Sequence, residues 1–313
     1  MDELTCAFDP LSKRWNSREI SVDPEFRCGL GRVRVMRVCD GLIGVRAGAV
    51  AWERLRTEPV GLVYLGSDGD HDFCVIDDDG AEMADLDFID VRAGVADLDN
   101  ADIQLVWSAL ALTAWHRRAL FCERCGSALE SANYGRKRVC ENGHEVFARM
   151  DPAVIMGIIN GAGELLVARN RRWPVGRISV LAGFVEAGET FEAAVRREVW
   201  EEAGVRVGAV EYAGSQPWPF PRSMMVAFYG YTADREVRPD GDEIVEAFFI
   251  GKDELRARVD AGELSLPSAA SVGLLWSCTG CVDNRGRIHI LASDIKRWWR
   301  RWIESFLDAK HEC

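Results

Sequence analysis

The glutamates between Gly183 and Val205 form the clearest chemical pattern in the sequence. Glu198, Glu201 and Glu202 are spaced i, i+3 and i+4, so an α-helix would place all three on one face. Like charges this close repel one another unless a cation offsets them, and hard carboxylate oxygens suit Mg²⁺ or Mn²⁺. An acidic face in contact with solvent is the ordinary alternative. The length of the whole pattern favours a divalent-metal site.

A second group of residues has the spacing of zinc ligands. Cys122 and Cys125 form a Cys-x-x-Cys knuckle, and Cys140 follows where the return knuckle of a zinc ribbon would lie. A glycine occupies the position of a fourth cysteine, so we favour His144 as the fourth ligand. Two later cysteines are the alternative fourth ligands: Cys278 and Cys281. Free buried thiols are the alternative to a metal site. We predict one structural Zn²⁺ per chain, with no open position for catalysis.

A proline-rich segment, residues 215–223, reads Ser-Gln-Pro-Trp-Pro-Phe-Pro-Arg-Ser. Three prolines restrict φ and favour a stiff, extended loop. Trp218 and Phe220 offer aromatic faces, while Gln216 and Ser223 offer an amide and a hydroxyl group. Such a loop suits a flat heterocycle joined to a ribose phosphate. A structural turn with core aromatics is the alternative interpretation.

The segment 183–205 resembles the Nudix box of the Nudix hydrolase family over its full length. It reads Gly, five residues, Glu, seven residues, Arg-Glu, an aliphatic residue, one residue, Glu-Glu, one residue, Gly and an aliphatic residue. The proline-rich segment at its offset from this box resembles the NADH pyrophosphatase subfamily, whose bacterial members also remove NAD caps from RNA. Trp115-His116 before the cysteines and residues 149–155 after them agree with that subfamily. The resemblance is specific from about residue 90 to 250.

By position, the resemblance implies roles for individual residues. Glu202, Glu201 and Glu198 are the catalytic candidates, and Glu202 is the best candidate to help activate water. The backbone carbonyl of Ala182 and the Glu243 carboxylate complete the Mg²⁺ or Mn²⁺ ligands. Arg197 and Glu189 orient the helix and its preceding loop through an ion pair. The implied substrate contacts are Phe147, Phe184, Gln216, Pro217, Trp218, Pro219, Phe220, Pro221, Arg222, Ser223 and Gly273.

The resemblance also implies a function and an assembly. The expected reaction is metal-dependent hydrolysis of the pyrophosphate of NAD⁺ or NADH to AMP and nicotinamide mononucleotide. On NAD-capped RNA the products would be nicotinamide mononucleotide and 5′-monophosphate RNA. Two or three Mg²⁺ or Mn²⁺ ions per site and a homodimer are expected. The alternatives are a Nudix hydrolase for ADP-ribose or diadenosine polyphosphates, and a non-catalytic NAD- or RNA-binding module.

Hydrophobic periodicity and turn residues indicate the elements that must position these groups. A helix is predicted over 101–120, a hairpin over 153–168 around Asn160-Gly161, and a helix over 191–203 that begins after Thr190 and ends at Gly204. Strands are predicted near 207–213, 224–232 and 244–250, and a Trp-rich helix over 295–307. We therefore expect an α/β fold: a β-rich N-terminal domain (1–116), a zinc-ribbon module (117–150) and a Nudix α/β/α sandwich with a mixed sheet and a helical tail (151–313).

Composition excludes several other classes of protein. The 313 residues are 28% charged and 48% hydrophobic, which is ordinary for globular domains. The formal charge of −12 argues against a general nucleic-acid coat, although it leaves room for a local phosphate site. We expect no membrane span and no secretory signal, and therefore a cytoplasmic protein in which the cysteines stay reduced.

Overall fold

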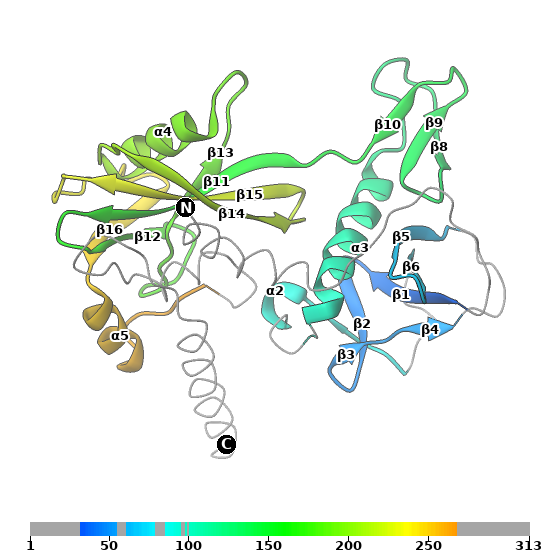
Figure 1. Ribbon diagram of the computed structural model, residues 1–313, viewed down its shortest axis with the longest axis horizontal. Coiled ribbons are helices and arrows are strands. Elements are labelled where there is room, and N and C mark those ends of the chain that lie inside the picture. Colours follow the sequence, from blue (N-terminus) through cyan, green and yellow to red (C-terminus); the bar gives the residue numbers. More distant parts are fainter. Residues whose placement is uncertain (1–31, 55–60, 79–84, 95–97, 99, 268–313) are drawn as a thin grey trace.

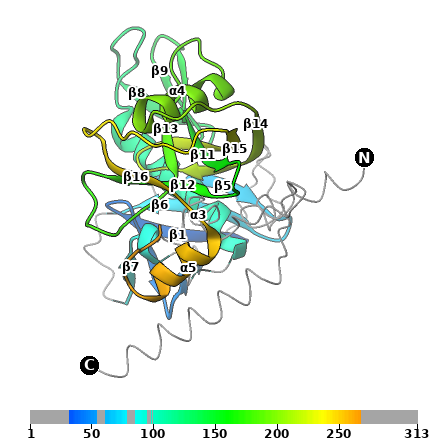
Figure 2. The same cartoon turned by 90° about the vertical axis from the view of Figure 1, so that its left-hand side faces the viewer.

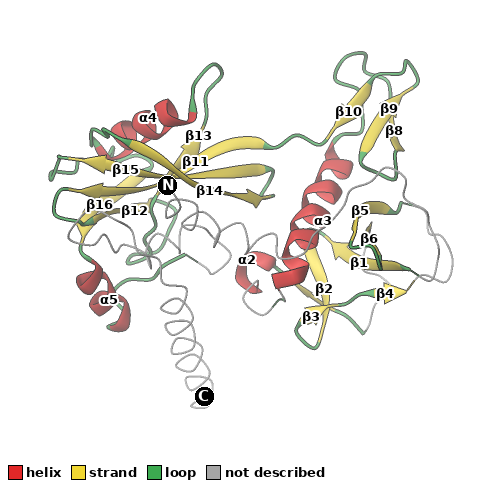
Figure 3. Ribbon diagram, in the orientation of Figure 1, coloured by secondary structure: helices red, strands yellow, loops and turns green. Residues whose placement is uncertain are grey.

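A computed structural model describes residues 32–54, 61–78, 85–94, 98 and 100–267. Within these residues the strands form three sheets, which Figure 3 shows in yellow. Several predictions lie outside the described residues: the helix at 295–307, Gly273, and the alternative zinc ligands Cys278 and Cys281. The division of the chain at residues 116 and 150 remains a proposal, and the grouping of the described strands is consistent with it. No helix among the described residues is both long enough and apolar enough to cross a membrane.

The N-terminal sheet packs against one long helix. Its described strands run in the order β3-β2-β1-β6-β5, with β4 beside β1 and β7 beside β2. Helix α3, predicted over 101–120, spans Asn100–Arg118 and packs on β1, β5 and β6. Trp107 and Leu110 of α3 are buried in this core. The bounds are β1 Val33–Cys39, β2 Leu42–Arg46, β3 Ala49–Val50, β4 Glu53–Arg54, β5 Val63–Ser67, β6 Asp72–Asp77, β7 Asp87–Ile89 and α2 Val91–Gly94.

The small sheet that follows α3 consists of β8 (Leu129–Ala132), β9 (Lys137–Cys140) and β10 (Glu145–Phe147). Its β8–β9 turn lies against the N-terminal sheet, because the Tyr64 amide donates to the Tyr134 carbonyl at 2.8 Å. Arg138 also donates to the His116, Ala119 and Leu129 carbonyls, two of which lie at the end of α3. These bonds join the cysteine-bearing module to the helix before it (Figure 1).

The C-terminal part is an α/β/α sandwich. Its mixed sheet has the order β14-β15-β11-β12-β16, with β13 also paired to β11; β11 and β15 are parallel and the other pairs are antiparallel. The views in Figures 1 and 2 place α4 and α5 on opposite sides of this sheet. The bounds are β11 Asp151–Asn160, β12 Leu165–Asn170, β13 Leu181–Phe184, α4 Phe191–Ala203, β14 Val210–Trp218, β15 Ser223–Thr232, β16 Ile244–Ile250 and α5 Lys252–Asp260.

Side chains that point alternately to the two faces of β11 explain why the sheet has a core on each face. Val154, Met156 and Ile158 point to the core under α4, whereas Ile155 lies in the core on the α5 side. A strand buried on both faces needs apolar residues at nearly every position, and residues 153–160 of β11 are all buried. The predicted α/β/α sandwich is confirmed.

The carboxylate helix α4 has the predicted bounds. The Thr190 hydroxyl accepts a hydrogen bond from the Ala193 amide at its start, and Gly204 ends it in a left-handed conformation with φ 65°. Ala194, Val195 and Val199 are fully buried, so they fix which face of the helix meets the sheet. This packing determines which glutamates point inward.

Candidate active site

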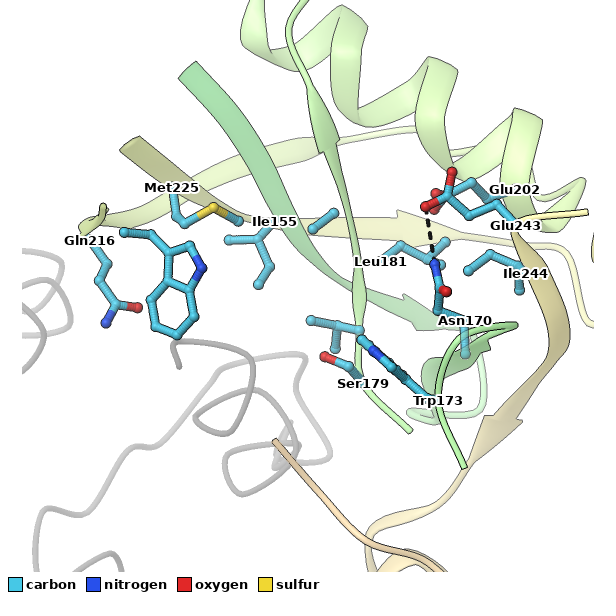
Figure 4. A pocket seen from close by; sticks show the side chains of 14 residues that line it. Ile155, Asn170, Trp173, Ser179, Leu181, Glu202, Gln216, Met225, Glu243 and Ile244 are labelled. Carbon is cyan, nitrogen blue, oxygen red and sulfur yellow. Dashed lines mark hydrogen bonds between the residues drawn. The ribbon is translucent and has the colours of Figure 1, made fainter. Parts of the chain in front are cut away.

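The glutamates of α4 differ in their surroundings. Glu202 is buried, with 7% of its surface exposed, whereas Glu201 is exposed. Glu198 is partly buried against β13, where any side chain at Gly183 would overlap its carboxylate. The absence of a side chain at Gly183 therefore allows Glu198 to approach the strand that carries Ala182. Glu243, from the segment before β16, lies beside Glu202 in Figure 4.

The electrostatics of this cluster favour a bound cation. Burial raises the pKa of Glu202 to about 8, and the charges of Glu198 and Glu243 add to the effect. Burial also raises the pKa of Glu198, with Arg197 acting in the opposite direction. One buried oxygen of Glu202, Oε2, accepts no hydrogen bond from any described residue. Converging carboxylates and an unsatisfied buried oxygen are the donor set that a hard divalent ion requires, so these residues fit Mg²⁺ or Mn²⁺.

Arg197 holds the outer side of the cluster. Its guanidinium lies 2.8 Å from Glu189, 2.9 Å from Glu198 and 3.0 Å from Glu201, and it donates to the Phe184 carbonyl at 2.9 Å. The predicted ion pair with Glu189 is confirmed. It ties the end of the preceding loop to α4, because Glu189 lies in the turn just before the helix.

A cavity of about 300 Å³ extends from the carboxylates into the domain. Its lining residues are Ile155, Ala168, Asn170, Trp173, Ser179, Val180, Leu181, Ala182, Glu202, Gln216, Trp218, Met225, Glu243 and Ile244. Figure 4 shows Glu202 and Glu243 at one end, and Gln216 and Met225 at the other. The cavity therefore has an acidic end and an end with an amide and apolar groups, a combination suited to a diphosphate joined to a flat ring.

The proline-rich segment is a hairpin and not the loop that we predicted. Gln216, Pro217 and Trp218 belong to β14 and pair with Met225, Met224 and Ser223 of β15. The prediction of a strand only near 207–213 was wrong because prolines argue against a strand. Here β14 is an edge strand of the sheet, where a missing N–H removes no ladder bond that the sheet needs. Gln216, 1% exposed, is thereby held rigidly in the cavity wall.

The aromatic rings of this hairpin face the N-terminal domain. Phe220 lies 5.9 Å from Trp107 and 5.2 Å from Trp218, measured between ring centroids, and the Arg92 guanidinium covers it at 5.0 Å. Phe220 is thus a core contact and is not among the cavity residues, whereas Trp218 both contacts Trp107 and lines the cavity. The packing of Phe220 therefore agrees with the alternative interpretation, in which the aromatic residues of this segment belong to the core.

The four residues of the cysteine module come together. Ligand atoms of Cys122, Cys125, Cys140 and His144 all lie within 4.8 Å of one another. The Cys125 and Cys140 Sγ atoms are 3.7 Å apart, and Cys122 Sγ is 3.6 Å from His144 Nδ1. A tetrahedral zinc with Zn–S bonds of about 2.3 Å has sulfur–sulfur edges of about 3.8 Å. Hydrogen bonds, first of all from the Ser127 amide, lower the pKa of the Cys125 thiol to about 5. The cluster fits zinc.

Comparison with known proteins agrees with this geometry. The model of the NUDIX domain family matches residues 149–267. These residues form a Nudix domain.

The chain also resembles curated proteins. The chain is 45% identical over 186 residues to the NAD-capped RNA hydrolase NudC of Mycobacterium bovis, covering 59% of each chain. It is 39% identical over 168 residues to the human NAD-capped RNA hydrolase NUDT12, covering 50% of this chain and 36% of that protein. A solved NUDIX hydrolase from Nitrosomonas europaea is 28% identical with a TM-score of 0.35, over 43% of this chain and 78% of that one. The chain spans about three-fifths of the length of the mycobacterial relative.

Other predicted substrate contacts lie apart from the cavity. Phe147 and Phe184 are 48% and 55% exposed, and neither lines the cavity. Pro219 and Ser223 are buried in the hairpin, while Pro221 and Arg222 are exposed; the Arg222 guanidinium lies 2.7 Å from Asp151.

Sequence reasoning missed Asn170 and Trp173 at the end of β12. The Asn170 amide donates to Glu243 at 3.1 Å, as Figure 4 shows, and Trp173 lines the cavity. Asn170 pairs with Ile244, which places it beside Glu243 across the strands. The sequence carries no signal of this kind, because a pairing register between distant strands is needed to find it.

Proposed function

We propose that the protein hydrolyses the pyrophosphate of NAD⁺ or NADH to AMP and nicotinamide mononucleotide. We further propose that it removes NAD from capped RNA and leaves a 5′-monophosphate end. The cavity that joins a carboxylate cluster to a buried amide carries this proposal, since a dinucleotide offers a diphosphate to one end and a ring to the other. The similarity to proteins named NAD-capped RNA hydrolase supports the choice of substrate.

Named residues would perform separate tasks. Glu198, Glu202, Glu243 and the Ala182 carbonyl would hold two or three Mg²⁺ or Mn²⁺ ions, with Glu201 assisting. Such ions, when bound, offset the charge of the diphosphate and lower the pKa of water. The Oε2 atom of Glu202 lacks a donor among the described residues and is the group best placed to take a proton from the attacking water.

The remaining residues would orient the helix and the substrate. Arg197 keeps α4 and its preceding turn together through its bonds to Glu189 and the Phe184 carbonyl. Gln216 would orient the nicotinamide or adenine ring by hydrogen bonds. Its side chain is buried in the cavity wall, near the end of β14, where the strand pairs with β15. Trp218 would form an apolar side of the same subsite.

We also propose a structural zinc ion bound by Cys122, Cys125, Cys140 and His144. A reducing, cytoplasmic environment would keep the cysteines available as thiolates. Arg138 joins this module to the end of α3, so zinc would stabilise the module and its contact with that helix. The carboxylates of α4 lie far from it in sequence. A homodimer is proposed by family resemblance.

The test is a product assay by chromatography with NADH, ADP-ribose and NAD-capped RNA, each with Mg²⁺ or Mn²⁺. Release of nicotinamide mononucleotide from NADH and from capped RNA is the expected result. Preferential cleavage of ADP-ribose would identify a different dinucleotide hydrolase. No turnover on any substrate would contradict the proposal and favour a binding module.

A further inference from the structure

The segment between β12 and β13 carries three arginines close in sequence to residues that line the cavity. Residues 171–177, here called the arginine loop, read Arg-Arg-Trp-Pro-Val-Gly-Arg. Arg171, Arg172 and Arg177 are exposed. Trp173 lies between them in sequence and lines the cavity, as Figure 4 shows. Trp173 thus belongs to the wall of the candidate active site, and exposed arginines flank it in sequence.

Backbone bonds hold the arginine loop in place. The Trp173 amide donates to the Asn170 carbonyl at 2.9 Å, which closes a turn at the start of the loop. At its end, the Ser265 amide donates to Gly176 at 2.9 Å, and the Ile178 amide donates to Ser265 at 3.0 Å. Gly176 has φ 83°, a left-handed conformation that favours glycine. The positions of the arginine Cα atoms are thus set by pairing with the segment after α5.

The three arginines differ in what offsets their charge. Arg171 donates to the backbone carbonyls of Gly241 and Asp242, and the Asp242 carboxylate lies 3.9 Å away. The Arg177 guanidinium covers the Trp173 ring at 5.6 Å. Within the described part of the chain, the side chains of Arg172 and Arg177 form no ion pair. Two positive charges therefore remain on the arginine loop, in a protein whose formal charge is −12.

At the other end of the cavity, the described residues include an arginine whose charge is offset. Arg222, in the turn of the β14–β15 hairpin, is paired with Asp151 at 2.7 Å. A polyanion that approaches an acidic protein needs unpaired cations close to the site, because each phosphate contact releases a condensed counterion. Among the residues that the structure describes around the cavity, the arginine loop meets this need best.

We propose that the arginine loop binds the backbone phosphates of the RNA strand that continues from the NAD cap, through Arg172 and Arg177. The inference rests on the proposed function. Capped RNA and NADH present the same dinucleotide to the cavity, but only RNA continues beyond it as a chain of phosphates. The loop would therefore contribute to turnover of capped RNA and not to turnover of NADH.

Arg172→Gln is the sharpest test, because the Arg172 side chain forms no hydrogen bond or ion pair with any residue that the structure describes. We expect kcat/KM on a single-stranded NAD-capped RNA to fall about three- to tenfold at low salt, while kcat/KM on NADH stays within about twofold. The slope of log kcat/KM against log salt for RNA should become shallower by about 0.7, the value for one lost phosphate contact. Arg172→Lys keeps the charge and should retain most of the RNA activity.

The control is Arg54→Gln, an exposed arginine on β4 that Figure 1 shows across the molecule from β12. It removes the same charge and should leave both substrates and the salt slope unchanged. Equal losses on NADH and RNA in Arg172→Gln, no loss on RNA, or an unchanged salt slope would each overturn the role of the loop. Absence of turnover on both substrates in the unchanged protein would instead overturn the proposed function, and this inference with it.

Discussion

Replacement of Glu202 by glutamine should stabilise the metal-free protein while it abolishes most of its activity. Glu202 is 7% exposed, and none of the residues in the described ranges donates a hydrogen bond to its Oε2 atom, so ionisation places a charge in the core without a compensating bond there. Glutamine has nearly the same shape without that charge. A residue that costs stability and is suited to bind cations is the expected signature of a functional group.

The pKa shift gives the magnitude and the sign. The folded-state pKa of Glu202, about 8, lies above its ordinary value of 4.5, so the folded protein binds the proton more tightly than the unfolded chain. The penalty is absent below pH 4.5, grows as the pH rises to about 8, and is then constant at about 5 kcal/mol. A buried glutamine amide also costs free energy, and this cost offsets part of the stability gained by removing the charge. We therefore expect a net gain of about 2 kcal/mol in the free energy of unfolding at pH 8.

Urea denaturation in EDTA at pH 5 and pH 8 measures this gain, with the exposed Glu201→Gln as the matched control. Glu201→Gln should change stability by less than about 1 kcal/mol, because an exposed ion pair contributes little. Addition of Mn²⁺ should stabilise the unchanged protein more than Glu202→Gln, since an ion that binds only the folded state shifts unfolding by mass action. Turnover of NADH should fall by orders of magnitude.

Two results would refute the reasoning about Glu202. If Glu202→Gln is no more stable than the unchanged protein in EDTA at pH 8, the buried charge is compensated by a group that we have not identified. If its turnover at saturating Mn²⁺ is near that of the unchanged protein, Glu202 has no role in catalysis.

The other predictions concern zinc, the substrate and Glu243. Cys122→Ser should lose bound zinc and lower the melting temperature, because metal binding and folding of a small module are coupled; elemental analysis measures it, and zinc-free native protein would contradict it. Unchanged zinc affinity in His144→Ala would point to a different fourth ligand. Gln216→Ala should reduce kcat/KM for NADH more than for ADP-ribose, by the about 1–3 kcal/mol of a lost buried polar contact, at an unchanged melting temperature; equal losses would make the hairpin a scaffold. Asn170→Ala should raise the Mn²⁺ concentration needed for half-maximal activity by about tenfold, since it removes the bond that orients Glu243, and an unchanged value would argue against that role.

Local chemistry in the sequence determined the carboxylate helix and the cysteine cluster. Thr190 and Gly204 supply the two caps of α4, and three glutamates three and four residues apart must share a face. The zinc-ligand spacing likewise brings Cys122, Cys125 and Cys140 close together through short hairpins. These features depend on contacts between residues near in sequence, so a pattern of residue types suffices to predict them.

Tertiary structure alone decided which of these groups can act together. The packing of α4 on the sheet buries Glu202 and exposes its neighbour Glu201, a difference that two adjacent glutamates do not reveal. The register of β12 with β16 brings Asn170 to Glu243. The edge position of β14 allows a proline-rich segment to form a strand. The contact of Phe220 with Trp107 could not be predicted for the same reason, because Trp107 lies more than a hundred residues earlier. Burial and register arise from contacts between distant segments, and only the folded chain brings those segments together.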